Sequence, residues 1–253
     1  MTKENNIIYK VINYFIYAPI NSILSKLNFA SLHKKYRQNS FDKTFDWDWT
    51  KTNFNRIALV NLLVSKTTDC NYLEIGCDSN GLFNSVPALR KTGVDPQNGG
   101  TIRKTSDEFF QENQSYFDVV FIDGLHTYEQ VRNDVINSIK FLKPGGWIAL
   151  HDLLPRSWIE HHVPILTTGL WTGDVWKVAF ELAQTDGIDF KIIKIDHGVG
   201  VLRLNKDNPS LVDLRHELDD RQFSYFYENI SKLPLVEWSD CQDWLRKTEP
   251  AQV

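Results

Sequence analysis

Short apolar runs alternate with amphipathic segments along this chain, and the alternation predicts an α/β fold. Residues 118–122 and 147–150 are apolar runs that suit strands buried on both faces. Between them, apolar residues recur at three- and four-residue intervals and predict one face of a helix: Tyr128, Val131, Val135, Ile139 and Leu142. Residues 143–146, Lys-Pro-Gly-Gly, are expected to end this helix, because Pro lacks an N–H and Gly tolerates a left-handed cap.

The same signals predict the other elements. Further strands are expected at residues 71–75, 91–94 and 101–104, and a hairpin at 190–195 and 200–204. Helices are expected at residues 55–66, 175–182, 211–218 and 238–244, and Asp174 is the expected cap of the second. A strand–helix–strand unit crosses over right-handed, so consecutive strands lie parallel and their carboxyl ends share one edge of the sheet.

Four polar residues follow two of the predicted strands at that shared edge. Asp123 and His126 leave the first strand, and His151 and Asp152 leave the second. In open α/β sheets, ligands bind outside the carboxyl ends of the strands. Any one of these residues alone suits a solvated loop or a helix cap. All four together favour a functional crevice, because function clusters on loops held by a rigid scaffold.

Composition narrows the class of protein. The length of 253 residues suffices for one large α/β domain with terminal additions, and 42% hydrophobic and 24% charged residues are ordinary for a globular protein. A net charge of -4 gives no sign of a nucleic-acid partner, which usually shows as a basic face. The three cysteines, Cys70, Cys77 and Cys241, are odd in number and form no CxxC motif. We interpret them as reduced thiols of a cytoplasmic protein.

The N-terminal stretch 7–24 is apolar and aromatic, but Lys10, Asn13 and Pro19 interrupt it. It therefore falls short of the roughly twenty apolar residues that a membrane-spanning helix needs. Three interpretations stay open: a helix that covers the core, a contact in a homodimer, and a helix that lies on a membrane surface. No spanning helix is predicted.

Two further features suggest a nucleotide in the crevice. A glycine-containing turn, residues 76–81, joins a predicted strand to a helix and lets the backbone approach a ligand closely. Asp95 closes the next strand and can accept hydrogen bonds from ribose hydroxyls, a role that Glu74 and the turn before it favour over a simple turn-former. A long non-periodic insert, about residues 153–173, is typical of a lid or substrate loop.

The chain resembles the class I S-adenosylmethionine-dependent methyltransferases over residues 55–204. Six motifs in the family's order carry the resemblance: YLEIGCDSNG from Tyr72, GVDP from Gly93, TSDEFF from Thr105, FDVVFIDGLHTYEQV from Phe117, KPGGWIALHD from Lys143 and GDVWK from Gly173. Among them it is most similar to a bacterial branch with FIDGLHTYE and HD signatures, often met among small-molecule and cell-surface-glycan methyltransferases.

The resemblance implies a Rossmann-like, doubly wound sheet of seven strands in the order 3-2-1-4-5-7-6, with strand 7 antiparallel. It implies three regions: an N-terminal helical extension and loop at 1–54, a methyltransferase core at 55–205 that contains the lid insert, and a C-terminal helical tail at 206–253.

The resemblance also implies roles for individual residues. Glu74 and Gly76 would flank the methionine part of the cofactor, Asp95 would bind its ribose, and Ser106 and Asp107 would contact its adenine. Further cofactor contacts are expected at Cys77, Asp78, Gly81 and Asp123. The positions that hold a divalent metal such as Mg²⁺ in related catechol-type enzymes correspond to Asp123, His151 and Asp152. The acceptor pocket is expected to include Trp171, Asp174, Trp176 and Lys177.

For catalysis, His126 or His151 can serve as the general base, since imidazole titrates near neutral pH. A metal can instead lower the pKa of a bound hydroxyl, with Asp152 among its ligands. We therefore expect O-methylation of a small molecule or glycan. The alternatives are a nicotinamide-dependent oxidoreductase, or a catalytically inactive S-adenosylmethionine-binding interaction module.

Overall fold

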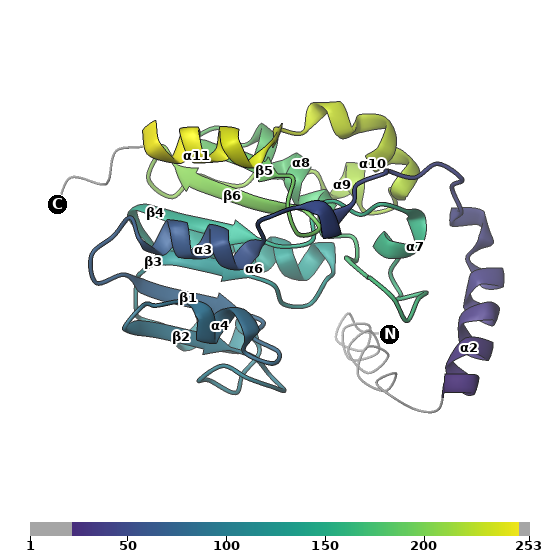
Figure 1. Cartoon of the computed structure of the whole chain (residues 1–253), viewed down its shortest axis with the longest axis horizontal. Helices are drawn as coiled ribbons and strands as arrows, with labels where there is room; N and C mark the ends of the chain where they lie inside the picture. The colour runs from purple at the N-terminus through teal and green to yellow at the C-terminus, as the bar shows by residue number, and fades with distance from the viewer. Residues whose placement is uncertain (1–21, 248–253) are drawn as a thin grey trace.

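The apolar runs form the strands of one seven-stranded sheet in the computed structural model, which describes residues 22–247 (Figure 1). The strands are β1 Asn71–Ile75, β2 Arg90–Val94, β3 Phe117–Ile122, β4 Leu142–Leu150, β5 Ile188–Ile193, β6 Val199–Leu204 and β7 Leu235–Val236. The helices are α2 Ser22–Lys35, α3 Arg56–Val64, α4 Gly81–Ser85, α5 Ser106–Glu112, α6 Tyr128–Lys140, α7 Trp158–His161, α8 Trp176–Gln184, α9 Arg215–Leu218, α10 Phe223–Asn229 and α11 Trp238–Lys247. Three short 3-10 helices are η1 Arg37–Asn39, η2 Trp49–Lys51 and η3 Ile230–Lys232.

The strand order is β2-β1-β3-β4-β6-β5-β7, and β6 runs antiparallel to both of its neighbours. The prediction of a Rossmann-like sheet with one antiparallel strand, contributed by the hairpin, is confirmed. The two edges differ from the prediction. The expected strand at 101–104 makes only an isolated bridge between Val94 and Ile102. At the other edge, the short strand β7 from the C-terminal tail pairs parallel with β5.

The missing edge strand has a local cause. The backbone N–H groups of Thr101 and Ile102 both bond to the carbonyl oxygen of Gly93, at 2.7 and 2.9 Å. The Arg103 guanidinium bonds to the carbonyl oxygens of Asp95 and Gly99. Ile102 thus pairs with the end of β2, since its carbonyl oxygen also accepts the Asp95 N–H, but the curled segment does not extend this pairing into a ladder.

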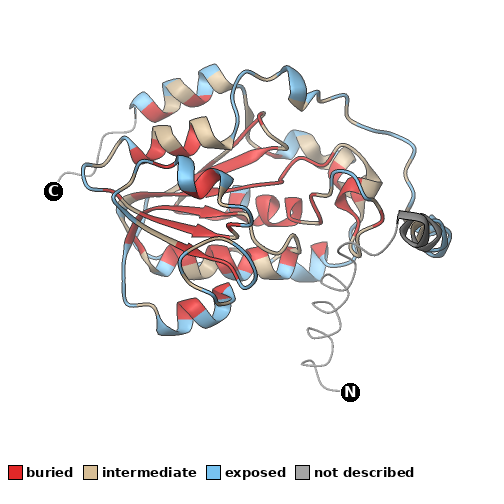
Figure 2. Cartoon of the chain, turned by 60° about the horizontal axis from the view of Figure 1, so that its bottom comes forward, coloured by how far each residue is buried: buried red, intermediate tan, exposed pale blue. Residues whose placement is uncertain are grey.

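Two helical layers cover the sheet, and alternate strand residues face each layer (Figure 1). Tyr72 and Val119 share a core with residues of α3, α4 and α11. Their neighbours Leu73 and Val120 pack on the other side with residues of α5, α6, α8 and α10. Figure 2 shows the result: the central strands are buried, and the helices that flank the sheet alternate buried and exposed positions.

The boundary between α6 and β4 also differs from the prediction. The helix ends at Lys140 and the strand begins at Leu142, so residues 143–146 lie inside β4. The pairing with β3 changes register across this stretch, from Phe117–Leu142 to Val119–Trp147. The Pro-Gly-Gly sequence thus forms an irregularity in a strand rather than a helix cap.

None of the helices in residues 22–247 has the length and apolar character needed to cross a bilayer. Most of the apolar stretch 7–24 lies outside the described residues, so its three interpretations stay predictions. The three cysteines are free and buried.

A buried ion pair joins α6 to α8. The Nε atom of Arg132 donates to both carboxylate oxygens of Glu181, at 3.0 and 2.9 Å, and both side chains are buried. Replacing Glu181 by Gln leaves the buried Arg132 charge with only the half-exposed Asp213 carboxylate, 3.8 Å from its Nη2 atom, so the free energy of unfolding should fall by about 3 kcal/mol. Urea denaturation measures this loss. The exposed pair Asp243–Arg246 is the control, and breaking it by Asp243→Asn should cause no measurable change.

Candidate active site

Loops from several strands bring charged side chains together at the carboxyl edge of the sheet. Asp123 follows β3, and His151 and Asp152 follow β4. The turn after β5 adds Asp196, and α3 contributes its first residue, Arg56. The predicted clustering of the residues that follow β3 and β4 is observed, because the two strands are parallel and paired.

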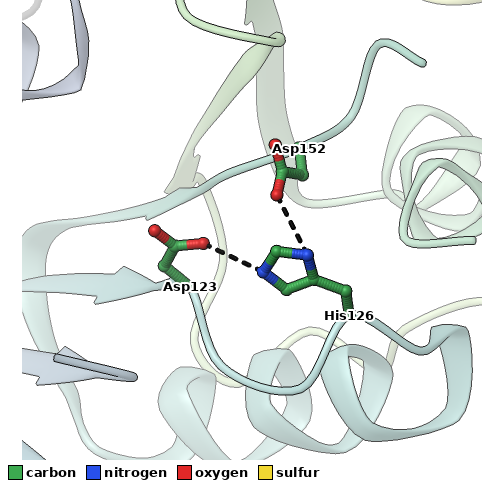
Figure 3. A group of neighbouring side chains, drawn as sticks. All are labelled: Asp123, His126 and Asp152. Carbon is green, nitrogen blue, oxygen red and sulfur yellow. Dashed lines mark ion pairs between the residues drawn. The ribbon is translucent and has the colours of Figure 1, made fainter. Parts of the chain in front are cut away.

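Asp123 and Asp152 form a tight group with His126, which lies in the loop after β3 (Figure 3). The Nε2 atom of His126 lies 3.4 Å from Oδ1 of Asp123, and its Nδ1 atom lies 3.1 Å from Oδ2 of Asp152. One ligand atom from each residue lies within 4.8 Å of the others, which is a spacing suited to a metal ion. The resemblance implied His151 in this set, and His126 offers a further imidazole to the same two carboxylates.

The contacts of His126 fix the position of its proton. Its Nδ1 atom lies 3.1 Å from the carbonyl oxygen of Trp171, which can only accept a hydrogen bond. Nδ1 therefore carries a proton. Nε2 faces the Asp123 carboxylate, which also can only accept. Burial disfavours the charged imidazole, but the carboxylates of Asp152 and Asp123 outweigh it and raise the pKa of His126. Imidazole ligands of metals are commonly oriented by such a bond to a backbone carbonyl. The Trp171 indole stacks on the imidazole, with 5.2 Å between the ring centroids.

His151 lies beside this group and is more deeply buried. Its Nδ1 atom lies 3.3 Å from Asp123 and 3.2 Å from Asp152, while its Nε2 atom lies 3.1 Å from Nη1 of Arg56. Burial disfavours the charged imidazole, but the carboxylates of Asp152 and Asp123 outweigh it and raise the pKa of His151. The guanidinium can only donate, so it opposes this effect and needs a lone pair on Nε2. The proton of the neutral ring is therefore on Nδ1, facing the two carboxylates.

The surroundings favour ionised carboxylates. Burial alone would raise the pKa of Asp123, but His151 and His126 outweigh it and hold that pKa well below the usual range. Burial would likewise raise the pKa of Asp196, but His151 and Arg56 outweigh burial and lower that pKa. The group thus carries several negative charges, which suits a cationic ligand.

Backbone strain is concentrated in the same place. Asp152, Asp196 and His197 have φ angles of 64°, 43° and 61°, in the left-handed region that residues other than glycine rarely adopt. Asp is among the residues that tolerate this region best. Strained residues at a cluster of ionisable groups are typical of functional sites.

The glycine turn packs directly against the Asp123 loop. Gly76 has a φ of 82°, and a Cβ atom at this position would lie 2.1 Å from the carbonyl oxygen of Asp123. Only glycine therefore fits between the end of β1 and the end of β3. This contact joins the predicted cofactor turn to the charged group, as the sequence analysis expected of one crevice.

Asp95 holds the turn from the other side. Its carboxylate accepts four backbone N–H bonds: at Oδ2 from Cys77 and Asp78, both 3.0 Å, and at Oδ1 from Gln97 and Asn98, both 2.8 Å. Burial works against ionisation, but these bonds outweigh it and lower the pKa of Asp95. The residue thus has a structural role, and its predicted contact with a ribose stays a prediction.

The other predicted cofactor residues lie around this turn. Glu74 is buried in β1 and accepts a 2.5 Å hydrogen bond from the Tyr72 hydroxyl, and burial raises its pKa to about 7. Gly81 begins α4. Ser106 and Asp107 begin α5, and the side-chain amide of Gln130 donates to both, at 3.1 and 3.3 Å.

The predicted acceptor residues separate into two groups. Trp171 covers His126. Asp174 does not cap α8, because its Oδ1 atom instead accepts the Tyr128 N–H at the start of α6, at 2.7 Å. Trp176 is fully buried in the core, and the buried Lys177 ammonium bonds to Asp174. These positions give the last three residues structural roles.

The insert at 153–173 is tied down at both sides of the site. Gly173 approaches the His126 backbone so closely that a Cβ atom would lie 1.8 Å from its carbonyl oxygen. At the other side, two residues that come directly after α2 contact His162 of the insert. The Tyr36 ring packs on the His162 ring, with 4.6 Å between the ring centroids, and the Asn39 side-chain amide forms a hydrogen bond with the same ring. Figure 1 shows α2 beyond the carboxyl edge.

Two charged residues of the site escaped the sequence analysis. Arg56 and Asp196 form an ion pair at 3.2 Å, and the Arg56 backbone N–H bonds to the same carboxylate. The predicted hairpin could have indicated Asp196. Its first strand runs parallel to β4, so the turn after that strand lies at the carboxyl edge of the sheet. No periodic signal marks Arg56.

The comparisons with known proteins agree with this geometry. Residues 35–153 match a family model described as "Methyltransferase domain". This segment belongs to the methyltransferase domain family. The match includes the glycine turn, Asp95, Asp123, His126 and the His151-Asp152 pair, while Asp196 lies outside it. A search of the curated proteins finds no match.

Several solved structures are similar in fold to this chain. An O-methyltransferase from Bacillus cereus, in complex with SAH, has 12% identity and a TM-score of 0.45, with 77% of this chain and 96% of that one covered. TomG from Streptomyces achromogenes, in complex with SAM, has 12% identity and a TM-score of 0.46, with 81% and 100% covered. An SAH-bound methyltransferase from Podospora anserina has 17% identity and a TM-score of 0.46, with 74% and 98% covered. These likenesses are too distant to carry residue roles to this chain.

Proposed function

We propose that the chain is an S-adenosylmethionine-dependent methyltransferase that methylates a hydroxyl oxygen of a small molecule or a glycan. One observation carries the proposal: Asp123 belongs to both halves of the site. Its backbone packs on Gly76 of the predicted cofactor turn, while its side chain belongs to the group with His126 and Asp152. A cofactor held by the turn would therefore end beside groups able to handle an acceptor's proton.

Two carboxylates near the glycine turn suit the amino group at the methionine end of such a cofactor. The carboxylates of Glu74 and Asp123 can accept hydrogen bonds from its ammonium group. The ionised Asp123 also favours the positive sulfonium nearby. The sulfonium is already activated, so the protein needs to align the acceptor oxygen in line with the methyl group and remove its proton.

The group of Asp123, His126 and Asp152 also fits a divalent cation. Two carboxylates and one imidazole form a mixed oxygen and nitrogen set that suits Mg²⁺ or Mn²⁺. The Trp171 carbonyl orients the imidazole for this role. A bound cation would lower the pKa of a hydroxyl coordinated to it.

Of the two candidate bases, His126 and His151, we propose that His151 accepts the acceptor's proton when its ring is neutral. Replacing His151 by Ala should abolish turnover, because the variant lacks the imidazole proposed to take the acceptor's proton. The affinity for S-adenosylhomocysteine should stay close to that of the wild type. Radiolabelled methyl transfer and calorimetry measure the two quantities, and unimpaired turnover in this variant would contradict the role.

We also propose that the residues at 153–173 act as a lid over the acceptor side of a catalytic core at 55–205. The stacking of Trp171 on His126 supports this. Three buried thiols suit the reducing cytoplasm. The terminal regions 1–54 and 206–253 are then additions to the core, and η2 and α11 belong to them.

Calorimetry with S-adenosylhomocysteine and with NAD tests the proposed function. We expect the first ligand to bind and the second to give no heat. Binding of NAD alone would favour the nicotinamide-dependent oxidoreductase. Binding of S-adenosylhomocysteine without methyl transfer to any of a panel of phenols and glycosides would favour the inactive binding module.

A further inference from the structure

Arg56 places a positive charge among the carboxylates of the candidate site. The Nη1 atom of this residue lies 3.2 Å from Oδ2 of Asp196 and 3.1 Å from Nε2 of His151. Its Nε atom lies 3.9 Å from Oδ2 of Asp123. The side chain is 34% exposed, so a ligand at the carboxyl edge can reach it.

One guanidinium nitrogen remains unused. Within the described residues, Nη2 of Arg56 makes neither a hydrogen bond nor an ion pair, although the two other nitrogens face Asp123, His151 and Asp196. Arginine side chains bind carboxylates through paired N–H groups. The neighbours therefore fix the plane of the guanidinium and leave donors available for a further anion.

The glycine turn itself has few donors to offer an anion. The N–H of Gly76 bonds to the Val94 carbonyl oxygen, and the N–H of Asn80 bonds to that of Cys77. The N–H groups of Cys77 and Asp78 bond to Asp95. Glycine turns usually bind anions through such N–H groups, and here most of them are already engaged.

We propose that Arg56 binds the α-carboxylate of the cofactor's methionine end. This inference rests on the proposed function, which puts S-adenosylmethionine in the crevice. An α-amino acid needs an acceptor for its ammonium and a donor for its carboxylate. Glu74 and Asp123 supply the first, and Arg56 supplies the second. An anionic acceptor suits Arg56 less well, because it would bring no positive charge of its own to the carboxylates of Asp123 and Asp196.

Two ligands distinguish a direct contact between Arg56 and the amino-acid end of the cofactor from a general loss of cofactor binding. S-adenosylhomocysteine carries the amino-acid end, and 5′-methylthioadenosine lacks it. Replacing Arg56 by Met keeps an unbranched stem and removes the guanidinium. The affinity for S-adenosylhomocysteine should fall ~10–100-fold, the loss expected for one charge-assisted hydrogen-bonding group. The affinity for 5′-methylthioadenosine should stay unchanged. Calorimetry of the full chain measures both.

Arg103 provides a matched control, because its guanidinium bonds to the Asp95 carbonyl oxygen at the far end of the turn. The Arg103→Met variant should keep the wild-type ratio of the two affinities. Should Arg56→Met not fold, Arg56→Lys keeps the charge without the fork and should still weaken S-adenosylhomocysteine selectively. An equal loss for both ligands, or no loss, would overturn the role of Arg56. A wild-type chain that binds neither ligand would instead refute the proposed function.

Discussion

Replacing Gly76 by alanine should abolish the binding of S-adenosylhomocysteine. The new Cβ atom would lie 2.1 Å from the carbonyl oxygen of Asp123 and 2.7 Å from the Cα atom of Gly124. Both neighbours are backbone atoms, so no side chain can turn away to relieve the overlap. The φ of 82° adds strain for any residue with a Cβ atom. We expect an affinity loss of at least ~100-fold, since displacement of the Asp123 loop disturbs both halves of the site.

Gly81 offers the matched control in the same turn. A Cβ atom at Gly81 would have only the Ser79 hydroxyl as a neighbour, at 4.0 Å, and its φ lies outside the left-handed region. Gly81→Ala should therefore leave the backbone of the turn in place, so its effect on S-adenosylhomocysteine affinity reports only a direct contact between Gly81 and the ligand. Thermal unfolding of both variants separates lost binding from lost folding. A Gly76→Ala protein with wild-type affinity would show that the ligand does not depend on this contact.

The sequence predicted the part of the site that depends only on strand direction. Asp123 and His151 follow apolar runs that had to be neighbouring parallel strands, because a helix of one apolar face separates them. Their side chains meet at 3.3 Å for that reason. The glycine turn and Asp95 were likewise predicted from the ends of β1 and β2. No knowledge of side-chain packing was needed for these positions.

The separate roles of His126 and His151 cannot be predicted without knowledge of side-chain packing. His126 and His151 both reach Asp123, and only the partners of their second nitrogens distinguish them. Those partners, Trp171 and Arg56, come from segments without a periodic relation to the sheet. The sequence therefore predicted the cluster, while the different partners of His126 and His151 became visible only in the structure.

The remaining errors have a similar origin. Asp174 precedes α8 and has the residue type of a cap, yet its carboxylate caps α6, which is distant in sequence. Trp176 belongs to a motif of the resemblance, but its position on the inner face of α8 buries it completely. The two-residue strand β7 is too short to leave an alternating pattern. Each error concerns packing between segments that no local signal relates.

Replacing Asp152 by Asn should abolish both metal binding and methyl transfer. Asn keeps the shape of the side chain and tolerates the φ of 64° at this position, so the fold should survive. The substitution removes one negative charge from the group with Asp123 and His126 and leaves a much weaker ligand. Loss of a residue that merely orients a ligand lowers metal affinity about 10–100-fold, so loss of the ligand itself should exceed that range. Electron paramagnetic resonance of added Mn²⁺ measures the affinity directly, and radiolabelled methyl transfer measures turnover.

Asp196 is the control for this variant, because it is also an aspartate with a positive φ at the carboxyl edge. Its carboxylate contacts Arg56 and His151 and is not one of the three grouped ligands. Asp196→Asn should therefore bind Mn²⁺ like the wild type. A wild type that binds no Mn²⁺, or an Asp152→Asn variant that binds it as tightly as the wild type, would contradict the metal site. Full turnover in the presence of a chelator would mean that the carboxylates and histidines act on the acceptor's proton without a metal.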